Sequence, residues 1–172
     1  MITNKNINKE NYQMKLSVII PFYDELKLIN RAVNSVLINS AFFDKVEIIL
    51  INDGSLEESV IRTYFDNNFN KLIKIIPNNY SKGPGGARNT GLDILKGDII
   101  AFLDADDFWL PRKLETQIKE IKKGATFVAT SYRFDNSKTI VNPASNIDIP
   151  EDIFLQRGIG TSTVILTKEL LE

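Results

Sequence analysis

Short runs of apolar and β-branched residues alternate along this chain with segments in which apolar residues recur at helical spacing. One strand-like run at Leu16–Pro21 is followed by a 3.6-residue apolar period between Leu28 and Leu37, and the next strand-like run follows at Val46–Ile51. This alternation is typical of α/β folds, because a parallel strand needs a crossover, usually a helix, to return to the same edge of the sheet. We therefore predict an α/β fold with a mostly parallel sheet.

The remaining elements are predicted from the same two patterns. A helix is expected to begin at Ser55, because Glu58 three residues later completes a capping-box pattern. Two more helices are expected, one at Ala87–Lys96 closed by Gly97 and one with Pro111 in its first turn. Strands are expected at four further runs: Leu72–Ile76, Asp98–Leu103, Ala125–Ser131 and Ser162–Thr167.

Cysteine and histidine are both absent from the 172 residues. Zinc sites built from these residues, thiol nucleophiles and serine-hydrolase triads with an imidazole base are therefore excluded. A metal ion must be bound through oxygen, which favours Mg²⁺ or Mn²⁺. The formal net charge is −1, from 21 basic and 22 acidic residues, and gives no sign of the basic face on which nucleic-acid binding depends. We expect oxygen-based chemistry and no nucleic-acid partner.

Acidic residues follow three of the predicted strands at the point where each strand ends. The carboxyl ends of parallel strands meet at one edge of the sheet, where α/β proteins bind their ligands. Residues two apart in an extended chain share a side, so Asp104 and Asp106 can converge on one cation or ligand; an acidic turn that only caps the next helix is the alternative. Because like charges repel, a group of acids at one edge predicts a bound cation or a ligand that donates hydrogen bonds to them. The acids of this group are Asp24, Glu25, Asp53, Asp104, Asp106 and Asp107.

A glycine-rich loop at Lys82–Asn89 precedes one of the predicted helices. Its glycines permit close backbone approach, the helix N-terminus favours phosphate, and Arg88 can donate charge-assisted hydrogen bonds. No Lys-Ser/Thr pair follows, so this is not a Walker A loop, and its place after the third strand does not fit the dinucleotide fingerprint. A flexible connector with a surface arginine is the alternative interpretation.

Four motifs in this order resemble those of the family 2 glycosyltransferases, which have the nucleotide-sugar-binding GT-A fold. The resemblance runs from about Leu16 to Leu114 and implies an α/β/α sandwich with a mostly parallel central sheet. It also implies an enzyme that takes a sugar from a nucleotide-diphosphate donor. The motifs are Ser17–Glu25 (SVIIPFYDE), Ile49–Ser55 (ILINDGS), Gly83–Asp107 (GPGGARNTGLDILKGDIIAFLDADD) and Trp109–Pro111 (WLP).

The resemblance assigns roles position by position. Asp53 corresponds to the carboxylate that bonds uracil or another base, Asp104 to the ribose-side acid of the DxD motif, and Asp106 to the acid that binds a divalent metal, Mn²⁺ or Mg²⁺. Asp24 replaces the family's commoner Asn, and Asn52 stands where many members carry a first Asp, so the base contact rests on Asp53 alone. The implied nucleotide-sugar site comprises Pro21, Tyr23, Glu25, Asp53, Gly86, Arg88, Asp104 and Ala105.

The reaction that the resemblance implies is a single inverting displacement. A divalent ion neutralises the charge that develops on the departing nucleoside diphosphate, and an Asp or Glu acts as base toward the acceptor hydroxyl. We expect that base beyond Glu172; Glu151 and Asp152 are candidates, but a helix start beside Pro150 is the simpler interpretation. The implied partners are a nucleotide-sugar donor, with a UDP-sugar favoured, and a glycan or lipid-linked acceptor, as in polysaccharide biosynthesis.

The two ends of the chain give further expectations. Residues 1–13 are polar, and we expect a disordered arm before a GT-A domain at 14–172. A predicted helix has a single turn after Lys168, so we expect this domain to be C-terminally incomplete and the strand at Val164–Leu166 to favour self-association. Without a secretory signal or a membrane-spanning run, a cytoplasmic location is expected, with peripheral association at the inner membrane face in a longer protein.

Three other functions fit part of the pattern. A nucleotidyltransferase also combines a glycine-rich loop with metal-binding carboxylates, but usually carries the glycines after its first strand, where this chain has Phe22–Glu25. The same missing glycines count against a dinucleotide-dependent oxidoreductase, although Asp53 fits its ribose acid. The third is a domain that binds nucleotide without turnover. Metal-dependent binding of UDP, ATP and NAD distinguishes these possibilities.

Overall fold

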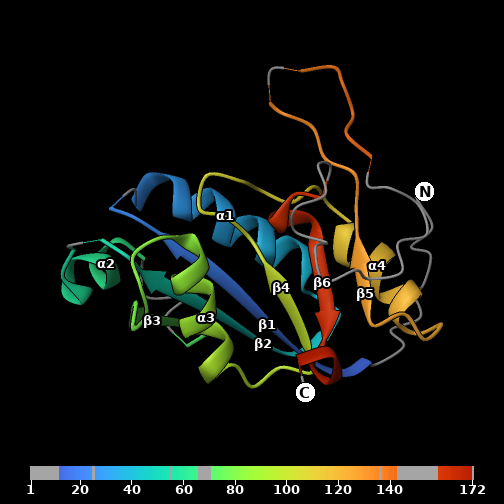
Figure 1. Ribbon diagram of the computed structural model, residues 1–172, viewed down its shortest axis with the longest axis horizontal. Coiled ribbons are helices and arrows are strands. Elements are labelled where there is room, and N and C mark those ends of the chain that lie inside the picture. Colours follow the sequence, from blue (N-terminus) through green and yellow to red (C-terminus); the bar gives the residue numbers. More distant parts are fainter. Residues whose placement is uncertain are drawn as a thin grey trace, which may run out of the picture.

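The computed structural model describes residues 12–24, 26–54, 56–65, 71–135, 137–142 and 159–171 (Figure 1). The expectations that concern residues 1–11, Glu25, Ser55, Glu151 and Asp152 lie outside the described residues. No helix in the part of the chain that the structure describes is long and apolar enough to cross a membrane.

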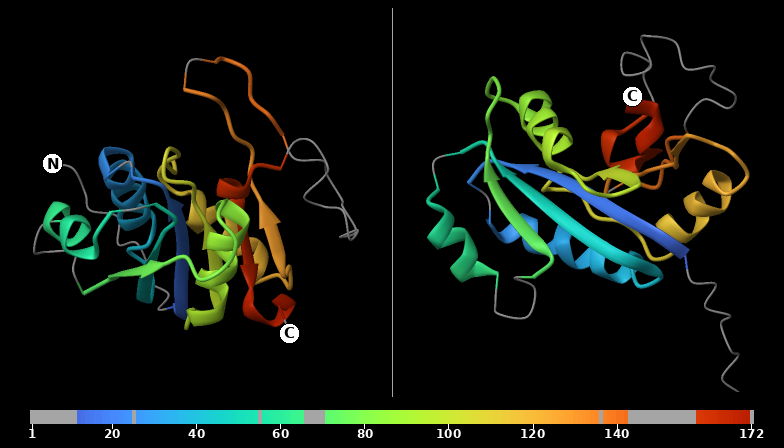
Figure 2. Two further views of the ribbon diagram at one scale, coloured as in Figure 1. Left: turned by 60° about the vertical axis from the view of Figure 1, so that its left-hand side comes forward. Right: turned by 90° about the horizontal axis from the view of Figure 1, so that it is seen from below.

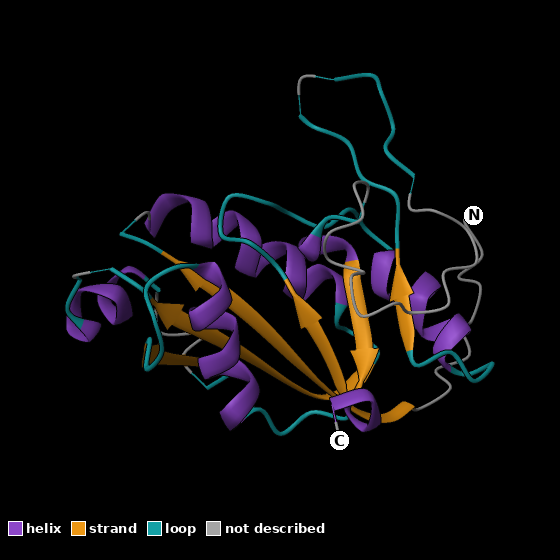
Figure 3. Cartoon of the chain, in the orientation of Figure 1, coloured by secondary structure: helices purple, strands orange, loops and turns teal. Residues whose placement is uncertain are grey.

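A six-stranded sheet in the order β3-β2-β1-β4-β6-β5 forms the centre of the molecule (Figure 3). β1, β2, β3 and β4 run parallel to one another, whereas β6 pairs antiparallel with both β4 and β5. The prediction of an α/β fold with a mostly parallel sheet is therefore confirmed. The strands are β1 (Tyr12–Phe22), β2 (Phe43–Asn52), β3 (Ile73–Pro77), β4 (Ile99–Phe102), β5 (Phe127–Ala129) and β6 (Val164–Thr167).

Helices cover both faces of this sheet, and two hydrophobic cores result (Figure 2). Successive side chains of β1 point to opposite faces, so Val18 and Ile20 enter one core and Ile19 the other. The first core packs against α1 (Leu26–Asn39), α2 (Glu58–Tyr64) and α4 (Lys113–Ile121), and the second against α3 (Pro84–Ile94). Two short 3₁₀ helices, η1 (Thr161–Thr163) and η2 (Lys168–Leu171), flank β6.

The predicted helix starts are wrong in two places, at α3 and α4. α2 begins at Glu58, with Glu57 at the N-cap and no side-chain cap, and the predicted cap Ser55 lies outside the described residues. α3 begins at Pro84, three residues before the predicted start, because proline suits the first turn of a helix. α4 begins only after Arg112, whose φ of 71° is left-handed, so Pro111 precedes the helix instead of lying in its first turn.

A hydrogen-bonded carboxylate ties three strands together at the edge where the parallel strands begin. Glu47 accepts hydrogen bonds from the Ser17 hydroxyl, the Lys74 ammonium and the Lys96 N–H. Burial acts to raise the pKa of Glu47, but these hydrogen bonds outweigh it and hold the pKa below its ordinary value. Ser17 in turn accepts a 2.8 Å hydrogen bond from the Gly97 N–H. Gly97 thus joins β1 just before β4 begins and does not close α3, which ends at Ile94.

Substitution of Gly97 by alanine is expected to destabilise the fold. A Cβ at this position would lie 2.6 Å from the Ser17 backbone nitrogen, which cannot move without disturbing the sheet. Overpacking of this kind costs about 1–3 kcal/mol of unfolding free energy. Gly85→Ala is the matched control: nothing lies within 4 Å of its Cβ, and alanine is favoured in a helix by about 0.5–1 kcal/mol. Urea denaturation of both variants checks the prediction, and equal stabilities would contradict it.

Candidate functional site

The candidate site lies at the edge of the sheet where the parallel strands end. β1 ends with the buried residues Pro21 and Phe22. Asp53 follows β2 and donates its N–H to the Phe22 carbonyl at 3.0 Å. On the other side of β1, Leu103 donates its N–H to the Ile19 carbonyl at 3.1 Å, and Asp104 comes next in the chain. The backbone pairing therefore places Asp53 and Asp104 on either side of the end of β1.

Asp53 is held by the loop that follows β3. Its carboxylate accepts hydrogen bonds from the Asn78 amide at 2.6 Å and from the Gly83 N–H at 2.8 Å. Asn52 faces the turn instead: its amide group donates to the Leu56 carbonyl at 2.7 Å and accepts from the Gly54 N–H at 3.0 Å. A carboxylate at position 52 could accept but not donate, so asparagine suits this turn.

Asn78 organises the loop before α3, and sequence reasoning missed it. Its amide nitrogen donates to Asp53 and, at 3.1 Å, to the Ser81 carbonyl. Its amide oxygen accepts from the Tyr80 N–H at 3.0 Å and from the Thr90 hydroxyl at 2.9 Å. The sequence did offer one signal for its role: an asparagine directly after a strand and before a glycine-rich segment. At such positions the Asn side chain commonly forms a hydrogen bond with the backbone of the residue two positions later.

The glycine-rich loop contacts both acids through α3. Gly83 bonds Asp53, and Arg88 forms an ion pair with Asp104, with 2.5 Å between Nη2 and Oδ1. The Arg88 Nε is buried and has no hydrogen-bond partner among the described residues. A Cβ on Gly86 would lie 2.0 Å from the Ser81 carbonyl oxygen. Only glycine therefore allows the loop backbone at Ser81 to pack this closely against α3.

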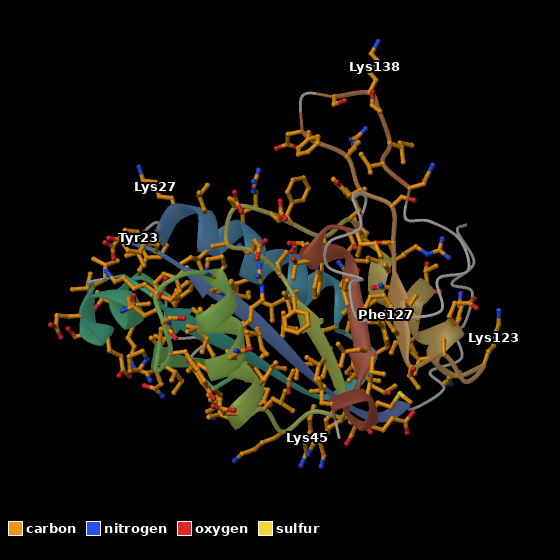
Figure 4. The ribbon with its side chains drawn as sticks, viewed as in Figure 1. Tyr23, Lys27, Lys45, Lys123, Phe127 and Lys138 are labelled. Atoms are coloured by element: carbon orange, nitrogen blue, oxygen red, sulfur yellow. The ribbon has the colours of Figure 1, made fainter. Side chains whose placement is uncertain are left out.

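Tyr23 and Asp24 form the rim beside Asp53. Tyr23 is 57% exposed, lies at the end of β1 (Figure 4), and its ring centre lies 5.5 Å from the Lys82 ammonium. Asp24 has a left-handed φ of 53°, and its carboxylate lies so close to Gly54 that a Cβ there would be 2.1 Å from Oδ1. The end of β1 and the loop after β3 thus face each other across the exposed edge.

The four residues from Asp104 form a tight acidic turn. The Asp107 N–H donates to the Asp104 carbonyl at 3.0 Å, and the Asp104 N–H donates to the Ser162 hydroxyl at 3.0 Å. Burial raises the pKa of Asp107; the Ser162 hydroxyl opposes this, and the charges of Asp106 and Asp104 add to it. Ala105 lies within the turn, and the exposed Asp106 carboxylate makes no hydrogen bond to a described residue.

The donor set of this turn suits a hard cation that a ligand helps to bind. Among the described residues, no group of three or more acidic side chains is placed to hold an ion by itself. Asp106 nevertheless presents exposed acceptor oxygens next to two further carboxylates. Mg²⁺ is commonly held by one or two carboxylates together with substrate phosphates. The residues present therefore fit a divalent ion shared with a diphosphate.

A cavity of about 750 Å³ extends from the acidic turn toward β5 and β6. Its far walls come from residues 130–135, at the start of a segment that projects from the body of the molecule, and from η1 (Figure 1). Ser162 of η1 connects this wall to the acidic turn, because its hydroxyl accepts from the Asp104 N–H and its carbonyl accepts from the Trp109 indole at 2.7 Å. Sequence reasoning missed Ser162, which lies 58 residues from Asp104 in the chain.

Residues 17–167 of this chain match the family described as Glycosyl transferase family 2. The chain belongs to family 2 of the glycosyltransferases. A relative from Escherichia coli, UDP-Glc:alpha-D-GlcNAc-diphosphoundecaprenol beta-1,3-glucosyltransferase WfgD, is 33% identical over 91% of this chain and 61% of its own length. An uncharacterized glycosyltransferase from Nostoc is 38% identical over 92% of this chain and 52% of its own length. The family 2 chain thus spans about half to three fifths of these relatives.

Two solved structures show the fold. A mannosyltransferase from Pyrobaculum calidifontis, in complex with GDP-Man and Mn²⁺, has a TM-score of 0.67 and 19% identity over 93% of this chain and 46% of its own. Staphylococcus aureus TarS 1-349, in complex with UDP-GlcNAc, has a TM-score of 0.66 and 23% identity over 92% of this chain and 46% of its own. The GT-A fold that the four motifs imply is confirmed.

The structure brings most of the predicted site residues of this family 2 chain to one edge, in two groups joined by α3. One group surrounds Asp53, and the other surrounds Asp104 and Asp106. Glu25 lies outside the described residues. The individual roles of these residues stay predictions.

Asn78→Ala is expected to loosen the loop before α3. The substitution removes all four hydrogen bonds of the amide group, and we expect a loss of about 1–2 kcal/mol in unfolding free energy, because the loop is partly exposed and water replaces some bonds. Hydrogen exchange of the Gly83 N–H should accelerate, since Asp53 loses the group that orients it. Asn89→Ala, at an exposed position of α3, serves as control. Unchanged exchange at Gly83 would contradict the role given to Asn78.

Proposed function

We propose that this chain binds the nucleoside diphosphate of a UDP-sugar and belongs to an enzyme that transfers the sugar, with inversion, to a glycan or lipid-linked acceptor. One observation carries the proposal: a single loop and helix hold Asp53 through Gly83 and Asp104 through Arg88. A nucleotide along this edge would meet a base acceptor at one end and a cation-binding acid at the other. The names of the relatives from Escherichia coli support the same donor and a diphosphoundecaprenol-linked acceptor.

Asp53 selects the base in this proposal. Each carboxylate oxygen accepts more than one hydrogen bond, so Asp53 can keep its bonds to Asn78 and Gly83 and still accept from a ligand. The ring N3–H of uracil is such a donor, whereas the corresponding nitrogen of cytosine is an acceptor. A carboxylate fixed at this position therefore favours uridine over cytidine nucleotides.

Arg88 and Asp106 act on the sugar and diphosphate end. The Arg88 Nε, which has no hydrogen-bond partner in the described part of the chain, offers a buried donor beside Asp104. A ribose or phosphate oxygen can accept a hydrogen bond from it. Asp106 would hold Mn²⁺ or Mg²⁺, which supplies positive charge to the departing diphosphate when bound. The Arg88–Asp104 pair keeps both side chains in place before the ligand arrives, which reduces the ordering cost of binding.

The acceptor occupies the cavity beyond the acidic turn in this proposal, and the base is a carboxylate outside the described residues. A lipid-linked acceptor would place the protein at the cytoplasmic face of a membrane. Binding of nucleotide without turnover is the second candidate. A transfer assay with a lipid-linked sugar acceptor separates the two, because only the enzyme forms a product.

Asp106→Asn is expected to remove the metal dependence of nucleotide binding and to leave the fold intact. The amide is a neutral and weaker ligand for a hard cation. Calorimetric titration of UDP with and without Mn²⁺ measures the effect, and thermal unfolding verifies the fold. Asp44→Asn, at an exposed position of β2, is the control. If Mn²⁺ still tightens UDP binding in the Asp106 variant as in the native chain, the assignment of Asp106 fails.

Asp53→Ala is expected to weaken UDP binding even without metal. A hydrogen bond to a charged group contributes about 1.5–3 kcal/mol, so a loss of roughly tenfold or more is expected. The native preference for UDP over CDP should also decrease, and competition binding with the two nucleotides measures it. An effect confined to the metal-bound complex would place Asp53 in the metal site instead.

A further inference from the structure

The cavity beyond the acidic turn contains a lysine that has no counter-ion among the described residues. Lys113, the first residue of α4, lines this cavity. No carboxylate of the described residues forms an ion pair with it, whereas Lys119 on the same helix pairs with Glu115 at 3.0 Å. Arg31, which also lines the cavity, pairs with Asp135 at 3.2 Å. Unlike Arg31 and Lys119, Lys113 thus has no charged partner among the described residues.

Two neighbours hold the Lys113 ammonium in place. It donates to the Gln117 side-chain oxygen at 2.8 Å and lies 4.3 Å from the centre of the Trp109 ring. Gln117 is itself fixed, because its amide nitrogen donates to the carbonyls of Val128 and Thr163, each at 2.8 Å. The ammonium is therefore positioned by α4, β5 and η1 before any ligand binds.

The surroundings of Lys113 favour an anion. Burial lowers its pKa to about 7, because the charged form loses hydration and no acid replaces it. A negative group that enters the cavity would restore the lost stabilisation and raise the pKa again. The other charged groups that line the cavity are the acids Asp104, Asp106, Asp107 and Asp135 and the cations Arg31, Arg112 and Arg133.

We propose that Lys113 binds the phosphate group of an acceptor in which a sugar is joined through a diphosphate to an apolar chain. This inference rests on the proposed function and assigns a residue of this chain to the phosphate of the acceptor proposed there. The rest of the wall fits that ligand, since sugars and apolar chains pack on aromatic faces. The aromatic residues lining the cavity are Phe108, Trp109, Tyr132 and Phe134.

The charge distribution along the cavity supports this orientation. The acids of the turn at Asp104–Asp107 line the part next to the donor edge, where a metal-bound diphosphate leaves. Lys113 and the exposed Arg133 line the cavity from other elements, α4 and the segment after β5. An acceptor phosphate would avoid the acids and bind these cations, which leaves the acceptor sugar between the phosphate and the donor.

The test compares binding of donor and acceptor to the same variants. The acceptor probe is N-acetylglucosamine diphosphate esterified with a short alkyl chain, titrated by calorimetry in the presence of UDP. Lys113→Met should weaken this binding at least tenfold, Lys113→Arg should retain most of it, and Lys119→Met on the same helix should leave it unchanged. Affinity for UDP should be the same in all four proteins.

A pH series separates binding from a structural role of Lys113. In the free native protein Lys113 is mostly neutral at pH 8, and a bound phosphate keeps it protonated, so complex formation should take up close to one proton. Affinity for the ester should therefore fall by up to tenfold per pH unit between pH 7 and 9. Titrations in two buffers of different ionisation enthalpy measure the proton uptake, which Lys113→Met should abolish.

Four outcomes would overturn the inference. These are unchanged ester affinity in Lys113→Met, an equal loss of UDP affinity, no proton uptake by the native protein, or tighter binding of inorganic pyrophosphate than of the ester. If Lys113→Met does not fold, the pH series on the native protein and the ester affinity of Lys113→Arg still test whether Lys113 binds the phosphate. Absence of UDP binding by the native protein would instead refute the proposed function, which keeps the two failures distinct.

Discussion

The parallel backbone pairing of β1 with β2 and β4 determines where the two central acids of the candidate site, Asp53 and Asp104, lie. The ladder continues beyond the strands, since Asp53 still bonds Phe22 and Leu103 still bonds Ile19. The strand residues Val18, Ile19 and Ile20 are fully buried in two cores on opposite faces of the sheet. A shift of register by one residue would exchange the side chains of the two cores and disrupt their packing, so it is disfavoured. The register that buries the core therefore also sets the positions of the two acids relative to β1.

Contacts distant in sequence complete the site. Asn78, Arg88 and Ser162 each contact an acid at a strand end from a different segment of the chain. Each acid can still bind a ligand, because these contacts occupy only some of the lone pairs of its carboxylate oxygens. The arrangement thus reduces the conformational freedom of the acids and keeps them accessible.

The sequence allowed the strands and the strand-end acids to be predicted because both follow from local patterns. Buried parallel strands are near-continuous apolar runs, and the chain direction alone places Asp53 and Asp104 at the same edge. The start of α4 was misplaced because Arg112 takes a left-handed conformation that no local rule indicates. Asn78 and Ser162 could not be assigned, since their roles depend on partners 25 and 58 residues away.

The position of β6 between β4 and β5 has a consequence for the order of folding. β5 pairs with β6 and with no other strand of the described residues, and β6 follows it by more than thirty residues in the chain. During synthesis β5 therefore leaves the ribosome without a partner, while β1 to β4 can already assemble. The cavity wall formed by η1 arises only when β6 inserts. The half of the sheet that carries Asp53 is thus complete first, and the half against which α4 and Lys113 pack is completed last.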